Sequence, residues 1–219
     1  MIKKLSPVEK MLILSIAFTM TLLLVRVKYT HDSIYMFYIW NTFLAILPLV
    51  FSKILTGQKK MNLLSFFLLI AWLLFYPNAP YIITDVFHYE QRLPVPMWYD
   101  LMLVISAAWN GLVLGMVSLM QVESFLSKHF KPLLVKIFVF ISFGLCGYGV
   151  YIGRYLRYNT WDVVAQPKLL IKSSALQVLH PHRNIDVWAF TALFAAMLCI
   201  IYFTVKQFQV SKLSVSREK

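Results

Sequence analysis

The stretch "MNLLSFFLLIAWLLFYPNAPYIITDVFH" (Met61–His88) decides the fold. Its first part, residues 61–77, is an uncharged apolar run of the kind that crosses a bilayer as a helix, which takes about 17–25 residues. Two prolines and an asparagine then interrupt the run. Asp85 and His88 follow among apolar neighbours. The stretch therefore predicts a membrane span that leads directly into a polar segment.

Composition extends this interpretation to the whole chain. Of its 219 residues, 60% are hydrophobic and only 14% are charged, whereas about a quarter of the residues of a typical soluble domain are charged. We predict an all-α, polytopic transmembrane helical bundle of about six spans, with a short amphipathic or re-entrant segment after the third. One integral membrane domain would cover residues 1–219, with a short basic cytoplasmic tail at 207–219. The expected spans are 9–27, 34–55, 61–77, 98–121, 134–153 and 186–206.

The net charge of +12 reflects topology. Lys and Arg cluster at the ends of the apolar runs and form no stripe with interleaved aromatic residues, so the pattern does not indicate a nucleic-acid partner. They are more numerous in the loops on the side of the two termini than in the opposite loops. This bias predicts a multi-pass membrane protein with both termini in the cytoplasm. The lipid bilayer is then its first partner, and no oligomeric state is indicated.

The segment after the third span is expected to be a short helix. Proline is favoured at the first position of a helix, and Pro80 is placed there. A helix from that point would carry Tyr81, Thr84, Asp85 and His88 on one face and apolar residues on the other. Under the predicted topology this face lies on the extracytoplasmic side.

Asp85 and His88 are the candidate catalytic residues. Their three-residue spacing lets the two side chains meet on a helix face. Such a pair could act as an oriented general base, or offer two ligands to a divalent metal as cofactor. A plain hydrogen bond at the water interface explains the same spacing, and the sequence leaves these interpretations open.

A second polar cluster lies at the outer end of the fifth span. Arg154 and Arg157 are three residues apart there, and the planar guanidinium suits bidentate recognition of phosphate or carboxylate. Ion pairs with Asp85, Asp100 or Asp162, or ordinary snorkelling toward the interface, are the alternatives. The candidate substrate-binding residues are Asn78, Arg154, Arg157, Asn159 and Asp162.

The fourth span carries a small-residue motif for helix packing. Gly111 and Gly115 have the G-x-x-x-G spacing, which lets two helix backbones approach closely in lipid. A pore or groove lined by glycine is the functional alternative. Asn110 lies mid-span, where an amide needs a partner, and so is expected to face the bundle interior.

Three blocks of sequence carry a family resemblance: "PNAPYIITDVFH" (77–88), "SAAWNGLVLGMVSL" (106–119) and "GRYLRYNTWD" (153–162). With these blocks in this order, the chain resembles the bacterial membrane family catalogued as domain-of-unknown-function family 1361. The resemblance implies a multispan bacterial inner-membrane protein and supplies no substrate or activity.

These observations favour a membrane protein with an extracytoplasmic polar site built from segments 78–100 and 153–162. It would bind, modify or translocate an anionic lipid-like or envelope substrate. One alternative is a non-catalytic structural or accessory component whose polar clusters are helix-packing ion pairs. Another is a small transporter, which a lack of buried charges within the spans would disfavour.

Overall fold

The computed structural model describes the backbone of residues 6–215 and the side chains of residues 6–208 except Val164. Within this part of the chain the structure is helical and contains no β-strand. The helices are α1 (Pro7–Thr30), α2 (Phe37–Thr56), α3 (Leu63–Phe75), α4 (Asn78–Tyr81), the 3₁₀-helix η1 (Ile82–His88), α5 (Met97–Leu126), α6 (Pro132–Arg154), α7 (Asp162–Ala165), α8 (Pro167–Leu179), the 3₁₀-helix η2 (Pro181–Arg183) and α9 (Ile185–Val215).

Six helical stretches are long and apolar enough, by length and composition, to cross a membrane. This confirms the all-α fold with six spans and supports a multipass membrane protein. The third stretch joins α3, α4 and η1 into one, so the segment predicted to follow the third span continues it. The six stretches are Pro7–Thr30, Phe37–Thr56, Leu63–His88, Met97–Leu126, Pro132–Tyr155 and Ile185–Phe208.

Local sequence signals explain where these helices begin. Ser6 caps α1 by accepting a hydrogen bond from the Glu9 amide at 3.2 Å, and the Glu9 carboxylate accepts one from the Ser6 amide at 2.7 Å. This reciprocal capping box satisfies two amides that the first turn leaves unpaired. The Asn62 side chain caps α3 by accepting a hydrogen bond from the Ser65 amide at 2.8 Å. Proline occupies the first turn of α1, α6 and α8, where its missing N–H is not needed.

The chain divides into two compact units, residues 1–129 (unit 1) and 130–219 (unit 2). The single membrane domain over residues 1–219 stays a prediction. Helix α9 continues to Val215, so the predicted tail at 207–219 begins as helix. Its basic side chains beyond residue 208 lie outside the described residues.

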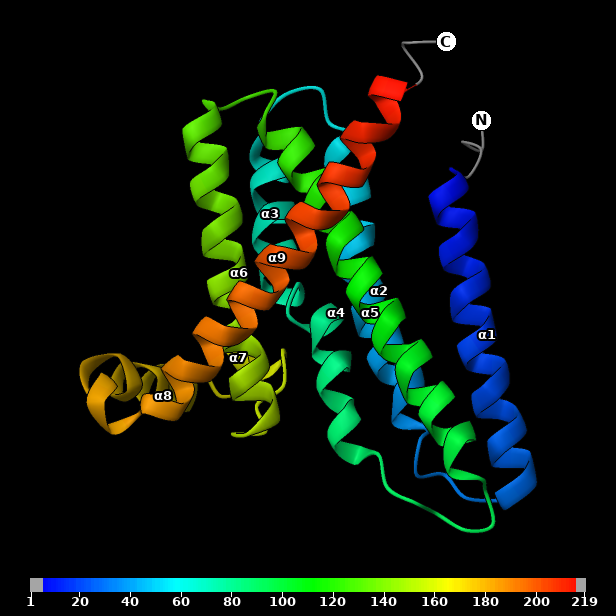
Figure 1. Cartoon of the computed structure of the whole chain (residues 1–219). Helices are drawn as coiled ribbons and strands as arrows, with labels where there is room; N and C mark the ends of the chain where they lie inside the picture. Colours follow the sequence, from blue (N-terminus) through cyan, green and yellow to red (C-terminus); the bar gives the residue numbers. More distant parts are fainter. Residues whose placement is uncertain (1–5, 216–219) are drawn as a thin grey trace. The chain divides into compact units, whose positions relative to one another are not determined.

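In unit 1, helix α5 packs against α1, α2, α4 and η1, and α2 also packs against α3 and α4. Figure 1 shows that the links 31–36 and 89–96 lie at one end of this unit, and that the link 57–62 lies at the other. We call the first of these ends the loop end of unit 1. The surface is apolar, with Leu63 70% and Trp109 59% exposed, while Asn110 and Ser118 are buried. A bundle surrounded by lipid hydrocarbon has this distribution.

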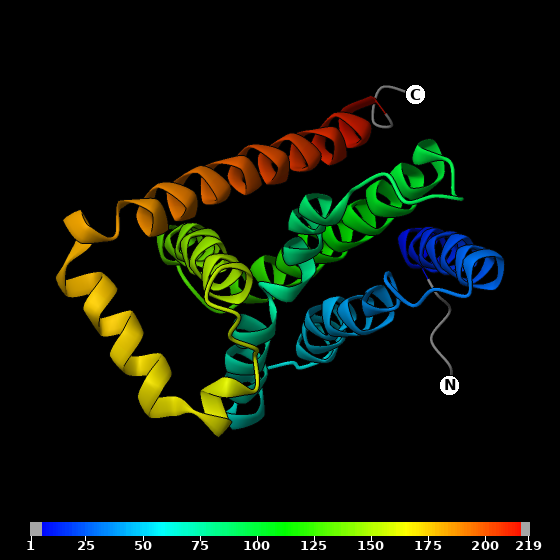
Figure 2. The same ribbon diagram turned by 90° about the horizontal axis from the view of Figure 1, so that it is seen from below.

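In unit 2, the main contact is between α6 and α9. A Cβ atom added at Gly147 would lie 2.7 Å from the Thr191 carbonyl oxygen, so the two backbones meet there. Helix α8 lies crosswise to α6, as Figures 1 and 2 show. It is anchored through Gln177, whose side chain accepts a hydrogen bond from the Tyr148 hydroxyl at 2.7 Å, while its carbonyl accepts one from the Trp188 indole at 3.2 Å.

Candidate functional site

The G-x-x-x-G motif of α5 holds the segment that contains Asp85. A Cβ atom added at Gly111 would lie 2.3 Å from the Ala79 carbonyl oxygen, and one at Gly115 would lie 3.3 Å from Pro80 Cγ. This confirms the predicted close approach of backbones. Because α4 covers both glycines, they are packing residues and line no groove. Helix α4 and η1 are thereby fixed against the centre of unit 1.

Asp85 is buried in η1, with 1% of its surface exposed. The Asn41 side chain of α2 donates a hydrogen bond to its Oδ2 at 3.2 Å. A carboxylate is expensive to bury within a span and is commonly functional there. The 3₁₀ conformation is also unusual, because η1 has seven residues and such runs rarely exceed three or four. Extended 3₁₀ stretches often mark hinges or strained segments.

Only some of the residues predicted to form the polar face of this segment point into the bundle. Thr84 and Asp85 are buried, but His88, at the end of η1, is exposed. Its ring lies edge-on to Phe37, with centroids 5.6 Å apart. Val86 and Phe87 are exposed as well, at 46% and 66%, which suits lipid contact. Thr84 and Asp85 are buried and Val86 and Phe87 are exposed because a helix in lipid turns its apolar side chains outward and its polar ones inward.

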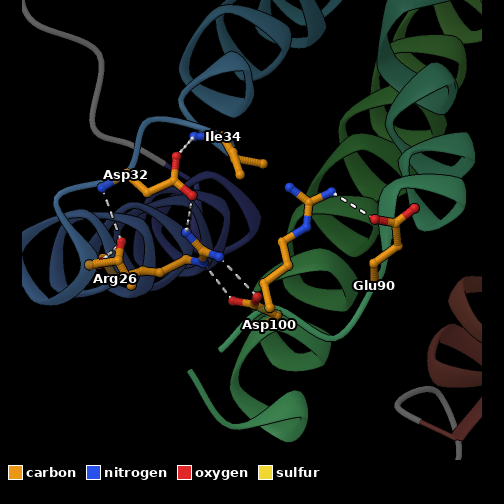
Figure 3. A network of polar contacts seen from close by, with 7 residues as sticks. Arg26, Asp32, Ile34, Glu90 and Asp100 are labelled. Carbon is orange, nitrogen blue, oxygen red and sulfur yellow. Dashed lines mark hydrogen bonds and ion pairs between the residues drawn. The ribbon is translucent and has the colours of Figure 1, made fainter. Parts of the chain in front are cut away.

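A buried ion pair lies at the loop end of unit 1, where the sequence predicted only the end of a span. Arg26 of α1 donates two hydrogen bonds to Asp100 of α5, Nε to Oδ1 at 2.7 Å and Nη2 to Oδ2 at 3.1 Å. The two residues are 2% and 1% exposed. Figure 3 shows Arg26 lying between Asp100 and Asp32, whose Oδ2 is 3.9 Å from Nη1. The pair joins α1 to α5 with the planar, bidentate geometry that strengthens charge-assisted hydrogen bonds.

Tyr35 lies beside this pair in the link between α1 and α2, and it is fully buried. The Arg26 guanidinium carbon is 4.5 Å from the centre of its ring, and that of Arg92 is 5.5 Å away. Burial raises the pKa of the Tyr35 phenol above its ordinary value, and the Asp100 charge adds to the rise, while Arg92 and Arg26 oppose it. The phenol therefore keeps its proton and remains a neutral O–H group.

A second polar network links α1 and α5 deeper in the bundle. Asn110 donates to Thr19 Oγ1 at 2.8 Å and accepts from Ser15 Oγ at 2.6 Å, while Thr19 donates to Ser106 at 3.0 Å. The predicted inward orientation of Asn110 is therefore confirmed. The expected lack of buried charges within the spans is wrong, because Arg26 and Asp100 are buried inside α1 and α5. That argument against a transporter accordingly fails.

The two arginines of the second cluster do not share a helix face. Helix α6 ends at Arg154, and Arg157 lies three residues beyond it in the left-handed region, with φ of 59°. There the Tyr158 amide donates back to the Ile152 carbonyl at 3.2 Å. The chain therefore reverses where the sequence predicted a continuing helix. Nothing in the residue pattern marks this turn, because glycine is the usual residue at such a position.

The other candidates in this cluster have local partners. Asp162 is 8% exposed, and its Oδ2 accepts a hydrogen bond from the Asn159 amide at 2.6 Å. It thereby closes the turn that leads into α7. In unit 1, the Asn78 side chain donates to the Phe75 carbonyl at 2.9 Å, which bridges the break between α3 and α4.

Replacing Arg157 with glycine tests whether the contacts of its side chain stabilise the protein by more than its left-handed backbone costs. A left-handed conformation costs a non-glycine residue about 1–2 kcal/mol, so Arg157→Gly should raise the free energy of unfolding by about 1 kcal/mol. Unfolding of the purified protein in detergent measures this. The matched control is Arg183→Gly in η2, where the backbone is not left-handed and glycine should destabilise by about 0.5–1 kcal/mol. A lower stability of Arg157→Gly would show that the side chain has a structural role.

Within the described residues, no group of three or more His, Cys, Asp or Glu side chains is arranged to hold a metal ion. Asp85 and His88 lie on one short helix, η1, and their predicted catalytic and ligand roles stay predictions.

Sequence reasoning missed Arg26, Tyr35 and Asn41, and it considered Asp100 only as a possible partner of Arg154 or Arg157. One signal was present: Ser15 and Thr19 in the first span, and Ser106 and Asn110 in the fourth, are both spaced four apart. Two such polar stripes on separate spans indicate helices that face each other. Arg26 and Asp100 lie at the same ends of those spans, so the stripes predict their pairing as well.

Comparison with known proteins gives one match. The model of the family described as "Protein of unknown function (DUF1361)" matches residues 40–201, which is most of the chain. Searches of curated proteins and of solved structures find no match. The chain belongs to the DUF1361 family.

Proposed function

We propose that this member of the DUF1361 family binds the polar end of an anionic lipid or other anionic cell-envelope molecule at the loop end of unit 1. The observation that carries the proposal is the burial of Asp85, a carboxylate that is 1% exposed near the end of an apolar span. With Asn41 as its neighbour at 3.2 Å, it can accept a hydrogen bond from a hydroxyl or ammonium group of a ligand. His88 is exposed at the same helix end, where its imidazole can contact the polar end of the ligand.

The position of this site suits a ligand that belongs to the membrane. Phe87 and Val86 are exposed beside the buried Asp85, so an acyl chain could lie along η1 while its polar end contacts the carboxylate. We place this end on the extracytoplasmic side, because the basic residues favour cytoplasmic termini. Arg154, Arg157 and Asn159 are proposed to contact anionic groups at the end of α6 in unit 2, as a surface of that unit.

The substitution Asp85→Asn tests the proposal. A hydrogen bond to a charged group contributes about 1.5–3 kcal/mol, so the amount of lipid that co-purifies with the protein should fall by about tenfold or more. Mass spectrometry of lipids extracted from protein purified in a mild detergent measures it. The control is Asp186→Asn, which removes an exposed carboxylate at the start of α9 and should change nothing.

The same experiment addresses a structural role, which the buried Arg26–Asp100 pair favours as a second candidate function. If Asp85 only held helices together, Asp85→Asn would reduce membrane abundance and thermal stability and leave the lipid content per molecule unchanged. Unchanged lipid content in a stable, abundant Asp85→Asn protein would contradict the binding proposal.

A further inference from the structure

Three polar atoms around the Tyr35 ring are buried without a hydrogen-bond partner among the described residues. They are Arg26 Nη1, Arg92 Nε and the Tyr35 hydroxyl. The two guanidinium carbons are 4.5 and 5.5 Å from the ring centre, so all three atoms belong to one cluster. A buried donor that lacks a partner costs about 1–3 kcal/mol, and native structures keep few of them. A group of three in one place indicates that something absent from the chain itself completes it.

The carboxylates nearby already accept hydrogen bonds elsewhere. Both oxygens of Asp100 accept from Arg26, at 2.7 and 3.1 Å. Asp32 Oδ1 accepts from the Ile34 amide at 3.0 Å, and its other oxygen is 3.9 Å from Arg26 Nη1, beyond hydrogen-bonding distance. Figure 3 shows these contacts. The unpaired atoms therefore need an acceptor from outside this network.

The positive charge of Arg92 is only weakly compensated. Asp100 and Asp32 lie beside Arg26, whereas Arg92 is paired with Glu90, at 3.4 Å, whose side chain is 72% exposed. Water weakens such a surface pair to about 0–1 kcal/mol. The Arg92 side chain is itself 23% exposed, so it connects the buried atoms to the surface.

We propose that Arg26, Tyr35 and Arg92 form a binding site for a phosphate-type oxyanion. One oxyanion presents several acceptor oxygens and a negative charge beside Arg92, whereas a single water brings no charge. Arginine's fixed fork of donors suits phosphate, and a tyrosine O–H supplies a neutral donor. A lipid phosphodiester and free inorganic phosphate share this chemistry.

This site deepens the proposed function and rests on it only in placing the ligand at the loop end of unit 1. Asn41 lies one helical turn after Tyr38 on α2, and the Tyr38 ring stacks on that of Tyr35 with centroids 5.9 Å apart. Asp85, held by Asn41, would take the hydroxyl or ammonium part of a head group, and the Tyr35 cluster its phosphate.

The test titrates the purified full-length protein with two probes. Inorganic phosphate is added in a neutral detergent, and separately the protein is placed in nanodiscs of phosphatidylcholine with increasing phosphatidylglycerol. The thermal unfolding midpoint of the wild type should rise with at least one probe. Stabilisation by phosphate alone identifies a soluble anion as the ligand, and stabilisation only by phosphatidylglycerol identifies a lipid head group.

Two variants locate the binding. Arg92→Gln should weaken the apparent affinity by about tenfold or more, and Tyr35→Phe, which removes only the hydroxyl, by several-fold. The matched controls are Lys28→Gln and Tyr29→Phe, exposed residues of the last turn of α1, which should bind as the wild type does. Because Tyr35→Phe keeps the buried ring, it should fold. It can therefore test the anion site on its own if Arg92→Gln does not accumulate.

The proposal is overturned if neither probe stabilises the wild type, or if Tyr35→Phe binds the anion as tightly as Tyr29→Phe. These results are independent of the lipid content of Asp85→Asn. Loss of co-purified lipid in Asp85→Asn together with unchanged anion affinity in Tyr35→Phe would keep the proposed function and remove the phosphate site. Unchanged lipid content in Asp85→Asn together with weakened anion binding in Tyr35→Phe would keep the phosphate site and remove the proposed function.

Discussion

Replacing Asp100 with asparagine should lower the free energy of unfolding by about 3–5 kcal/mol, the usual consequence of removing one partner of a buried ion pair. Arg26 is 2% exposed and donates two hydrogen bonds to this carboxylate. Asparagine has almost the same shape, so packing survives while the guanidinium loses its counter-charge. The nearest other carboxylate, Asp32, is 3.9 Å away and cannot replace a bidentate partner without movement. Unfolding of the purified protein in detergent measures the loss.

A double substitution separates lost charge from lost packing. In Arg26→Met/Asp100→Leu both charges are absent, and replacing a buried pair by apolar residues is often neutral or stabilising. The double variant should therefore be more stable than Asp100→Asn alone. The control Glu90→Gln removes an exposed carboxylate from the same end of unit 1 and should change stability by less than about 0.5 kcal/mol. A double variant no more stable than Asp100→Asn would show that the pair contributes more than its burial costs.

Replacing Gly111 with alanine should destabilise the protein by about 1–3 kcal/mol, the range for overpacking a tight core. The added Cβ atom would lie 2.3 Å from the Ala79 carbonyl oxygen and 3.0 Å from Ile82 Cβ. A main-chain carbonyl cannot rotate away as a side chain can, so α4 and η1 must move off α5. Since η1 carries Asp85, Gly111→Ala should also reduce the lipid that co-purifies. Unfolding and lipid extraction on one preparation measure both effects.

Two other glycines provide a graded control. At Gly115 the added atom would meet Pro80 Cγ at 3.3 Å, a contact that a small shift relieves, so Gly115→Ala should cost less than Gly111→Ala. At Gly144 it would meet nothing within 4 Å. Gly144→Ala should stabilise α6 by up to about 1 kcal/mol, because alanine is the better helix former. Equal stability of the Gly111 and Gly144 variants would contradict the close packing of α4 on α5.

The spans could be predicted because hydropathy is a local property. Each of the six runs is apolar over enough residues to identify it alone, and Gly111 and Gly115 indicate a close helix contact by spacing alone. Their partner could not be predicted, because it is the proline-interrupted segment 78–82 and not another regular span. The G-x-x-x-G spacing describes the surface of α5 and does not identify the segment that packs against it.

The candidate site was harder to predict, because its contacts join distant parts of the chain. Arg26 and Asp100 are 74 residues apart, and each alone has the pattern of a charge at a span end.

Arg157 shows a different limit of prediction from sequence. Its three-residue spacing from Arg154 predicts a shared face only if the helix continues, and the main-chain reversal at Arg157 depends on geometry that residue type does not indicate.

The family match begins at residue 40, within α2, and so excludes α1. Yet α1 supplies Arg26 to Asp100, and Ser15 and Thr19 to Asn110. A fragment cut at the homology boundary would expose a carboxylate and an amide to hydrocarbon with no counterpart, a state that costs several kcal/mol for each such group. The matched segment therefore lacks the partners that α1 supplies to Asp100 and Asn110. Any fragment meant to insert and fold independently has to start before α1.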